Sequence, residues 1–280
     1  MISIRIELWN SAKLPISNRK ELSTLYLHFL GRGAGFANEH TSAYFVTKGK
    51  DFFLIDCPSS TFVKVKNFDL SAYENFFVLI THTHGDHVGG LGLWAQYCFF
   101  VLHKKLNILA PSEEVAEDIK AFLTIEGNSL DWYNLHLIDS DELYGNNMSV
   151  YIEPVLTKHS PQLDGKCFGY YIENIFGDED VSPYDQLFVY TGDTSTLQPF
   201  EEFFGFAREI YVDVSVFYGQ IHLKLEEVLP QLIELTKKDI KVYLMHLDDV
   251  EAAEKLISGI TGIEVVTLSQ KMWNFVSRWH

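Results

Sequence analysis

The chain has 280 residues, 47% of them hydrophobic and 14% aromatic, which is enough apolar material for one large core, and we expect a single domain over residues 1–280. A formal net charge of −16, spread along the chain, opposes a general attraction to nucleic acid or to an anionic membrane. No run reaches the roughly 20 apolar residues of a membrane-spanning helix, and three cysteines without a CxxC pair fit a reducing, cytoplasmic compartment better than a disulfide framework.

Segments typical of strands and of helices alternate along the chain. In the first part of the chain we expect strands at 2–9 and 24–30, a hairpin over 42–57 that turns at 48–50, a strand at 75–81, a helix at 91–102, a strand at 106–111 and a helix at 112–127. Three strands are expected next, at 148–157, 167–173 and 186–191. In the last part helices and strands alternate, with helices at 198–207, 223–237 and 248–258 and strands at 209–214 and 241–246. Pro230 lies inside the helix at 223–237, so that helix is expected to kink or to start late. Such mixed alternation is typical of layered sheets covered by helices.

Residues 79–90, LITHTHGDHVGG, place four metal-binding side chains directly after an apolar strand. His82 and His84 alternate along the chain, so they can point the same way and bind one ion. Asp86 and His87 lie beyond the next turn and can reach a second ion. Neutral imidazole and carboxylate together suit zinc, and also manganese or iron. A polar turn with solvated histidines is the alternative, but ligand types this crowded favour a metal site.

Six residues cannot fill two coordination shells, so further ligands must come from later in the chain. Three candidates each lie at or just beyond the end of a predicted apolar strand: His159, Asp193 and His246. Taken singly, such a histidine is more typical of a capped or hydrogen-bonded surface residue. Together, and in this order, the three predict a two-metal site.

With these residues the sequence resembles the metallo-β-lactamase-fold hydrolases, whose HxHxDH motif matches residues 82–87. The resemblance covers nearly the whole chain and implies a four-layer αβ/βα sandwich, an α/β fold of two mixed sheets flanked by helices. It also implies that Asp56 orients the histidine loop and that Asp193 bridges two metals. The other implied ligands are His82, His84 and His159 for one ion, and Asp86, His87 and His246 for the second.

Within that superfamily the sequence is similar to the ribonuclease Z branch, through LGRGAGF, THTHGDHVGGLG and YTGDTS. Arg32 stands where that branch usually has threonine. His222 and Asp213 match the branch's proton-donating histidine and its carboxylate partner, with aspartate in place of the usual glutamate. The alternative for His222 is an ordinary residue at the start of a helix. Aspartate at position 193 argues against the true β-lactamases.

The implied chemistry is hydrolysis of a phosphodiester. Two divalent ions roughly 3.5–4 Å apart can hold a bridging hydroxide as the nucleophile. Asp86 and Asp193 would fix that hydroxide in line with the phosphate. His222, held as imidazolium by Asp213, would protonate the leaving alkoxide. This division of roles suits phosphodiester cleavage better than amide or lactone cleavage.

The substrate class follows from charge. The RNA-processing members of the branch usually carry a long basic arm, whereas residues 161–186 of this chain are acidic. A small anionic phosphodiester is therefore expected, and in length and motifs the chain is similar to the branch's cyclic-nucleotide phosphodiesterases, including those that phages use against nucleotide-signalling defences. The alternatives are a transfer RNA 3′-processing endoribonuclease, a lactonase or other carboxylic ester hydrolase, and a metal-stabilised binding protein. The resemblance also implies a homodimer.

Five aromatic residues lie in or near the predicted loops around this site and are suited to stacking on a base: Phe36, Tyr170, Tyr171, Phe217 and Tyr218. Most aromatic residues in such a chain belong to the core. The sequence therefore singles out none of them.

Overall fold

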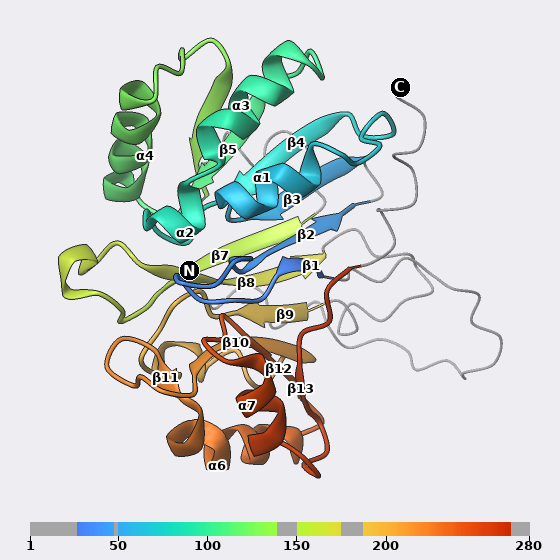
Figure 1. Ribbon diagram of the computed structural model, residues 1–280, viewed down its shortest axis with the longest axis vertical. Helices are drawn as coiled ribbons and strands as arrows, with labels where there is room; N and C mark the ends of the chain where they lie inside the picture. The colour runs from blue at the N-terminus through green and yellow to red at the C-terminus, as the bar shows by residue number, and fades with distance from the viewer. Residues whose placement is uncertain (1–26, 48–49, 139–149, 175–186, 270–280) are drawn as a thin grey trace, which may run out of the picture.

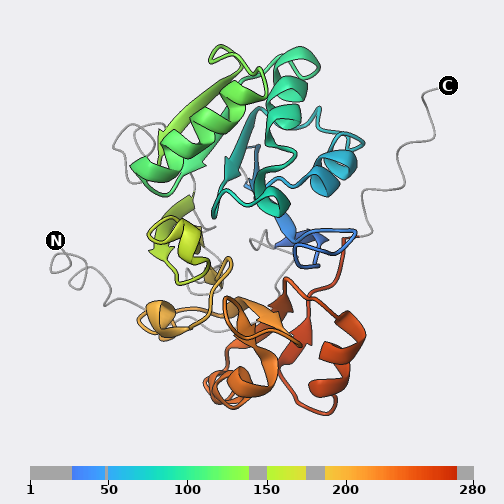
Figure 2. The same cartoon turned by 60° about the vertical axis from the view of Figure 1, so that its left-hand side comes forward.

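The computed structural model describes residues 27–47, 50–138, 150–174 and 187–269. Two mixed β-sheets face each other in it, and helices cover the outer face of each (Figure 1). The two helical layers remain on opposite outer faces when the molecule is turned (Figure 2). The predicted four-layer α/β sandwich is confirmed. The strand predicted at 2–9 and part of the hairpin turn, 48–49, lie outside the described residues.

The first sheet has the order β1-β2-β3-β4-β5-β6. Its strands are β1 His28–Gly31, β2 Ser42–Val46, β3 Asp51–Ile55, β4 Asn75–Leu79, β5 Leu106–Ala110 and β6 Tyr133–Leu137. The first three pair antiparallel and the rest pair parallel. Parallel strands need crossover connections, which are helical here. The crossover helices are α1 Ser59–Val65, α2 Gly85–Val88, α3 Leu91–Phe100 and α4 Glu113–Ile125.

The second sheet has the order β13-β12-β10-β9-β8-β7, with the short strand β11 paired to β10. Its strands are β7 Val150–Leu156, β8 Phe168–Asn174, β9 Leu187–Tyr190, β10 Glu209–Ser215, β11 Leu223–Lys224, β12 Lys241–Met245 and β13 Ile263–Val265. Strands β7, β8 and β9 pair antiparallel, and β9, β10, β12 and β13 run parallel. Its helices are α6 Leu225–Thr236 and α7 Val250–Leu256. The carboxyl ends of β7, β9, β10 and β12 therefore meet at one edge.

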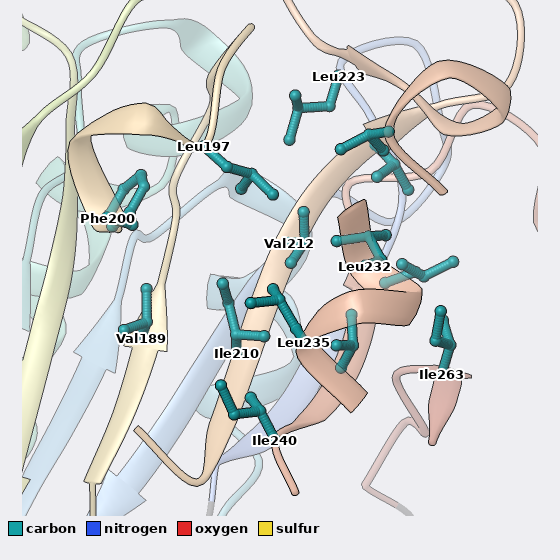
Figure 3. Packing of buried hydrophobic residues seen from close by; sticks show 14 of the residues in the cluster. Val189, Leu197, Phe200, Ile210, Val212, Leu223, Leu232, Leu235, Ile240 and Ile263 are labelled. Carbon is teal, nitrogen blue, oxygen red and sulfur yellow. The ribbon is translucent and has the colours of Figure 1, made fainter. Parts of the chain in front are cut away.

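Both faces of each sheet are buried, which is why the strands read as continuous apolar runs. In β10, Ile210 and Val212 pack with Leu232 and Leu235 of α6 (Figure 3). Tyr211, between them in the sequence, packs on the other face of the strand, between the two sheets. The first sheet alternates in the same way, with successive residues of β3 facing the helices and the second sheet in turn. The two sheets are thus held at a fixed distance by a shared apolar layer, and their edges form a rigid support.

The predicted helix at 198–207 is wrong. Only a short 3-10 helix, Gln198–Phe200, forms there, and a series of turns follows it. Phenylalanine and glycine are weak helix formers, and the turns bury Phe200, Phe203 and Phe204 against the second sheet.

The helix predicted at 223–237 begins two residues late, at Leu225, because residues 223–224 form β11. Pro230 lies inside it, where it removes one hydrogen bond. The strands β6, β11 and β13 and the helices α1 and α2 were not predicted. Within the described part of the chain, every helix is too short or too polar to cross a membrane.

Candidate metal centre

Four loops that follow strand ends bring the predicted ligands together. The loop after β4 carries the HxHxDH motif, and those after β7, β9 and β12 carry His159, Asp193 and His246. The side chains meet in several groups of nitrogen and oxygen atoms, although they come from positions up to 164 residues apart. Two of these groups share no residue, and a third, made of His82, His87 and Asp193, connects them. Rigid strand ends therefore determine where the groups lie.

The first group consists of three histidines. His82 Nε2 lies 2.9 Å from His84 Nδ1, and His159 Nε2 lies 3.3 Å from the same atom. Two donors that bind one tetrahedral zinc ion are separated by about 3.3–3.6 Å. The three rings are therefore close to the spacing that a single ion requires.

The second group consists of Asp86, His87 and His246. Asp86 Oδ2 lies 3.5 Å from Nε2 of both rings. Both histidines are buried, and the aspartate is largely covered. These 3.5 Å distances again match the separation of two donor atoms that bind one metal ion. The donors are the imidazole and carboxylate atoms that divalent transition metals prefer.

Asp193 lies between the two groups and contacts both. Its Oδ2 is 3.4 Å from His246 Nε2 and 3.5 Å from His87 Nε2. The same oxygen is 3.6 Å from His159 Nε2 and 3.8 Å from His82 Nε2. One carboxylate oxygen is thus within reach of both positions, as a bridging ligand must be.

An unpaired buried atom indicates that these residues fit a cation. His87 Nε2 is buried without a hydrogen-bond partner, although it faces two carboxylates. Its other ring nitrogen, Nδ1, lies 2.8 Å from Asp56 Oδ2 and is satisfied there. A buried polar atom left without a partner is costly. A metal ion within the second group would satisfy it.

The pKa shifts agree with this interpretation. Burial lowers the pKa of His82 and, to a smaller extent, that of His84, which favours the neutral imidazole that binds metals. Burial would also lower the pKa of His246, but the charge of Asp193 and the neighbouring carboxylates of Asp213 and Asp86 raise it to about 10. Negative charge is therefore concentrated around the second group, where a cation would lie.

Asp56 supports the histidine loop from beneath. It is fully buried after β3, with a positive φ of 59°. Its carboxylate accepts hydrogen bonds from the Thr81 N–H and the Thr81 hydroxyl, both at 2.8 Å, in addition to its contact with His87. Since the ring nitrogen Nδ1 is occupied, Nε2 is directed towards the metal position. The structure thus places Asp56 where the family resemblance puts the orienting aspartate.

His159 and His246 have oriented rings for similar reasons. His159 Nδ1 lies 2.9 Å from the carbonyl oxygen of Ile221, and His246 Nδ1 lies 3.2 Å from Asp213 Oδ1. The backbone N–H of His246 donates to the Thr41 hydroxyl at 3.0 Å. The sequence did not reveal these contacts, because loops that are distant in the chain supply them.

The pair expected to donate a proton lies beside the same centre. His222 Nδ1 is 2.8 Å from Asp213 Oδ2, which also accepts from the Thr194 N–H at 2.8 Å. Burial opposes the charge on His222, but the Asp213 carboxylate outweighs burial and raises the pKa of the ring above its usual value. The shorter aspartate therefore still reaches the histidine. Asp213 contacts both His222 and His246, and this dual role was not predicted.

A cavity of about 590 Å³ opens over the centre, within the range typical of small-molecule sites. Phe36 and Tyr218 line it, whereas Tyr170 and Tyr171 are buried in the core, so their expected place near the rim is wrong. Asp248 also lines the cavity and was not predicted. Its position two residues after His246 is a weak sequence signal.

The chain is similar to several known proteins. A protein-family model described as anti-Pycsar protein Apyc1 matches residues 25–267. The chain is 27% identical over 248 residues to an anti-Pycsar protein Apyc1 of Bacillus phage 010DV004, covering 81% of this chain and 90% of the relative. It is 34% identical over 136 residues to a ribonuclease Z of Methanococcus maripaludis, covering 46% of this chain and 44% of the relative, so the match spans less than half of that enzyme. The metallo-β-lactamase-fold protein YhfI of Bacillus subtilis has the same fold, with a TM-score of 0.63, 17% identity, and coverage of 88% of this chain and 97% of that one.

Proposed function

Because the chain belongs to the anti-Pycsar Apyc1 family, we propose that its histidine and aspartate centre hydrolyses cyclic nucleotides with two divalent metal ions. The chain is a metal-dependent hydrolase of the phosphodiesterase type. The observation that carries the two-metal proposal is the position of Asp193, one oxygen of which lies 3.4–3.8 Å from histidines of both groups. The family match supports the substrate class that the sequence resemblance implies.

Each side chain then has a defined task. His82, His84 and His159 hold one ion, Asp86, His87 and His246 hold the other, and Asp193 is shared. When bound, such ions lower the pKa of water to about 7 and offset the charge of the phosphate. Asp86 and Asp193 would orient the attacking group, and Asp56 keeps His87 in place.

We propose zinc as the metal, since five of the seven ligands are imidazoles, with manganese or iron as alternatives. Treatment with a chelator is expected to abolish hydrolysis of cyclic AMP, and added zinc should restore it with two metal equivalents per chain by elemental analysis. Calcium serves as a control, because it prefers oxygen ligands. Full activity in metal-free protein would contradict the proposal.

His222 is proposed to protonate the leaving alkoxide. Its Nδ1 is engaged by Asp213, and the residue lines the cavity. Replacing His222 with alanine is expected to slow cyclic AMP hydrolysis by roughly 10²–10⁴-fold, the usual contribution of general acid catalysis. Hydrolysis of bis-p-nitrophenyl phosphate should fall far less, because nitrophenolate leaves without a proton. Turnover numbers on both substrates check this, with metal content measured in parallel, and equal losses on both would exclude the proton-donor role.

Two other activities have less support. Transfer RNA cleavage is opposed by the net charge of −16, and the likeness to ribonuclease Z covers 46% of the chain. Lactone hydrolysis also expels an alkoxide, so the proton donor does not favour one activity over the other, but the family match supports a phosphodiesterase. An assay panel with cyclic nucleotides, precursor transfer RNA and an acyl-homoserine lactone distinguishes the three activities.

The family resemblance leads us to propose a homodimer in the cytoplasm. Cys57, Cys98 and Cys167 are all free and buried, which suits a reducing compartment. Analytical ultracentrifugation would test the oligomeric state.

A further inference from the structure

The cavity over the metal centre has a part that the proposed chemistry does not use. Its lining includes two aromatic side chains, Phe36 and Tyr218, in addition to the candidate ligands. Phe36 is fully exposed and Tyr218 is 72% exposed, so the described part of the chain leaves both rings in water. Large apolar rings at the mouth of a site are typical of surfaces that a ligand covers.

The loop that carries Phe36 is held rigidly beside the second metal group. It lies between β1 and β2 and is closed by a hydrogen bond from the Gly33 N–H to the Glu39 carbonyl at 3.0 Å. The preceding residue, Gly35, passes so close to Asp86 that a Cβ there would lie 3.0 Å from Asp86 Oδ2. Phe36 therefore follows directly after the point where the loop touches the site.

The loop that carries Tyr218 is fixed at both ends. At its start, the Asp248 carboxylate accepts from the backbone N–H groups of Val216 at 2.8 Å and Phe217 at 3.1 Å. At its end, the Ile221 carbonyl contacts His159. The N–H of Tyr218 itself donates to the Ser215 hydroxyl at 2.7 Å. The loop thus presents Tyr218 in a defined position.

One short segment anchors both loops. Leu247 and Asp248 directly follow His246. The Leu247 carbonyl accepts from the Ala34 N–H at 3.0 Å in the first loop, and Asp248 holds the second loop. The two rings are therefore placed in advance relative to the metal centre, which reduces the entropy cost of binding.

The charge of the cavity indicates what the rings contact. Among the described residues that line it, none is lysine or arginine. Beyond the metal position the lining includes Ser215, Gln220 and Asp248. A second phosphate would find no cation there, whereas an uncharged planar group could stack on the two rings.

We infer that Phe36 and Tyr218 form the stacking surface for the nucleobase of the substrate. The inference rests on the proposed function, in which the metal centre formed by the seven candidate ligands binds the cyclic phosphate. Stacking on aromatic side chains is a general means of binding bases, because every base has a π-face. The metal centre would then hold the phosphate while the two loops hold the base.

The test compares two substrates that differ only in the base. For cyclic AMP, Phe36→Ala and Tyr218→Ala are each expected to lower kcat/KM roughly 5- to 100-fold, mainly through KM. For ribose 3′,5′-cyclic phosphate, which has no base, kcat/KM should be unchanged. Tyr218→Phe keeps the ring and should behave like the wild type.

Matched controls separate stacking from general loop effects. Phe100 and Phe206 are exposed phenylalanines that lie outside the cavity. Phe100→Ala and Phe206→Ala should therefore leave both substrates unaffected. Equal losses on both substrates in the Phe36 and Tyr218 variants, or no loss on either, would overturn the inference. If the wild type hydrolyses neither substrate, the proposed function itself fails, and this inference fails with it.

Discussion

Asp193→Ala is expected to lower turnover of cyclic AMP by on the order of 10³-fold or more, because one substitution removes a ligand from both metal positions. Asp193 Oδ2 is the atom within 3.4–3.8 Å of four histidine nitrogens, and the neighbouring carboxylate of Asp86 reaches only two of them. Elemental analysis of the purified variant should show less than two metal equivalents per chain. Steady-state kinetics at saturating zinc measures the loss.

Two controls accompany this variant. Asp131 is an exposed aspartate outside the cavity, so Asp131→Ala should retain full activity and metal content. Asp193→Asn keeps the shape of the side chain and tests whether the lost charge is responsible. Circular dichroism should show that all three variants are folded. Normal turnover by folded Asp193→Ala would mean that the shared oxygen has no part in the reaction.

Asp56→Ala is expected to destabilise the protein by roughly 2–4 kcal/mol, because it leaves buried hydrogen-bond donors of Thr81 and His87 without a partner. Asp56 has no exposed surface, and its φ of 59° is better tolerated by aspartate or asparagine than by alanine. Metal affinity should fall about 10- to 100-fold as well, since His87 loses its orienting partner. Urea unfolding gives the first quantity, and zinc titration calorimetry gives the second.

The conservative variant Asp56→Asn separates these two effects. Asparagine can adopt the same backbone conformation and still accept the hydrogen bond of the Thr81 N–H, so the loss of stability should be smaller. Zinc binding should remain weakened, because an amide holds the ring of His87 less strongly than a carboxylate does. An unchanged unfolding midpoint and zinc affinity in both variants would exclude the supporting role of Asp56.

The sequence predicts most of the fold, because apolar strands of a doubly covered sheet are easily recognised. β6 shows where this fails. Its residues Asn134 and His136 both contact Asn107 Oδ1 of β5, at 3.0 and 3.3 Å, so polar side chains add to the backbone pairing of the two strands. Tyr133, Leu135 and Leu137 alternate with these polar residues over five positions only, and so short an alternation carries little strand signal until the neighbouring strand is known.

The candidate site likewise contains residues that the sequence predicts and residues that it does not. Its seven expected ligands follow apolar strands or form one compact motif, and they could be found from residue type and spacing alone. Asp248 and the Ile221 carbonyl could not, because their roles depend on two loops that meet only after folding. A backbone carbonyl leaves no trace in residue identity, and an aspartate that binds backbone N–H groups resembles any surface acid.

Phe36 and Tyr218 lie on loops, whereas the candidate metal ligands follow the ends of other strands. This separation has an evolutionary consequence. Neither residue is among the candidate metal ligands, and neither lies on one of the strands that lead to them. Selection can therefore change which heterocycle is preferred while the rate of bond cleavage is preserved. A change of base preference would then require substitutions at only a few loop positions.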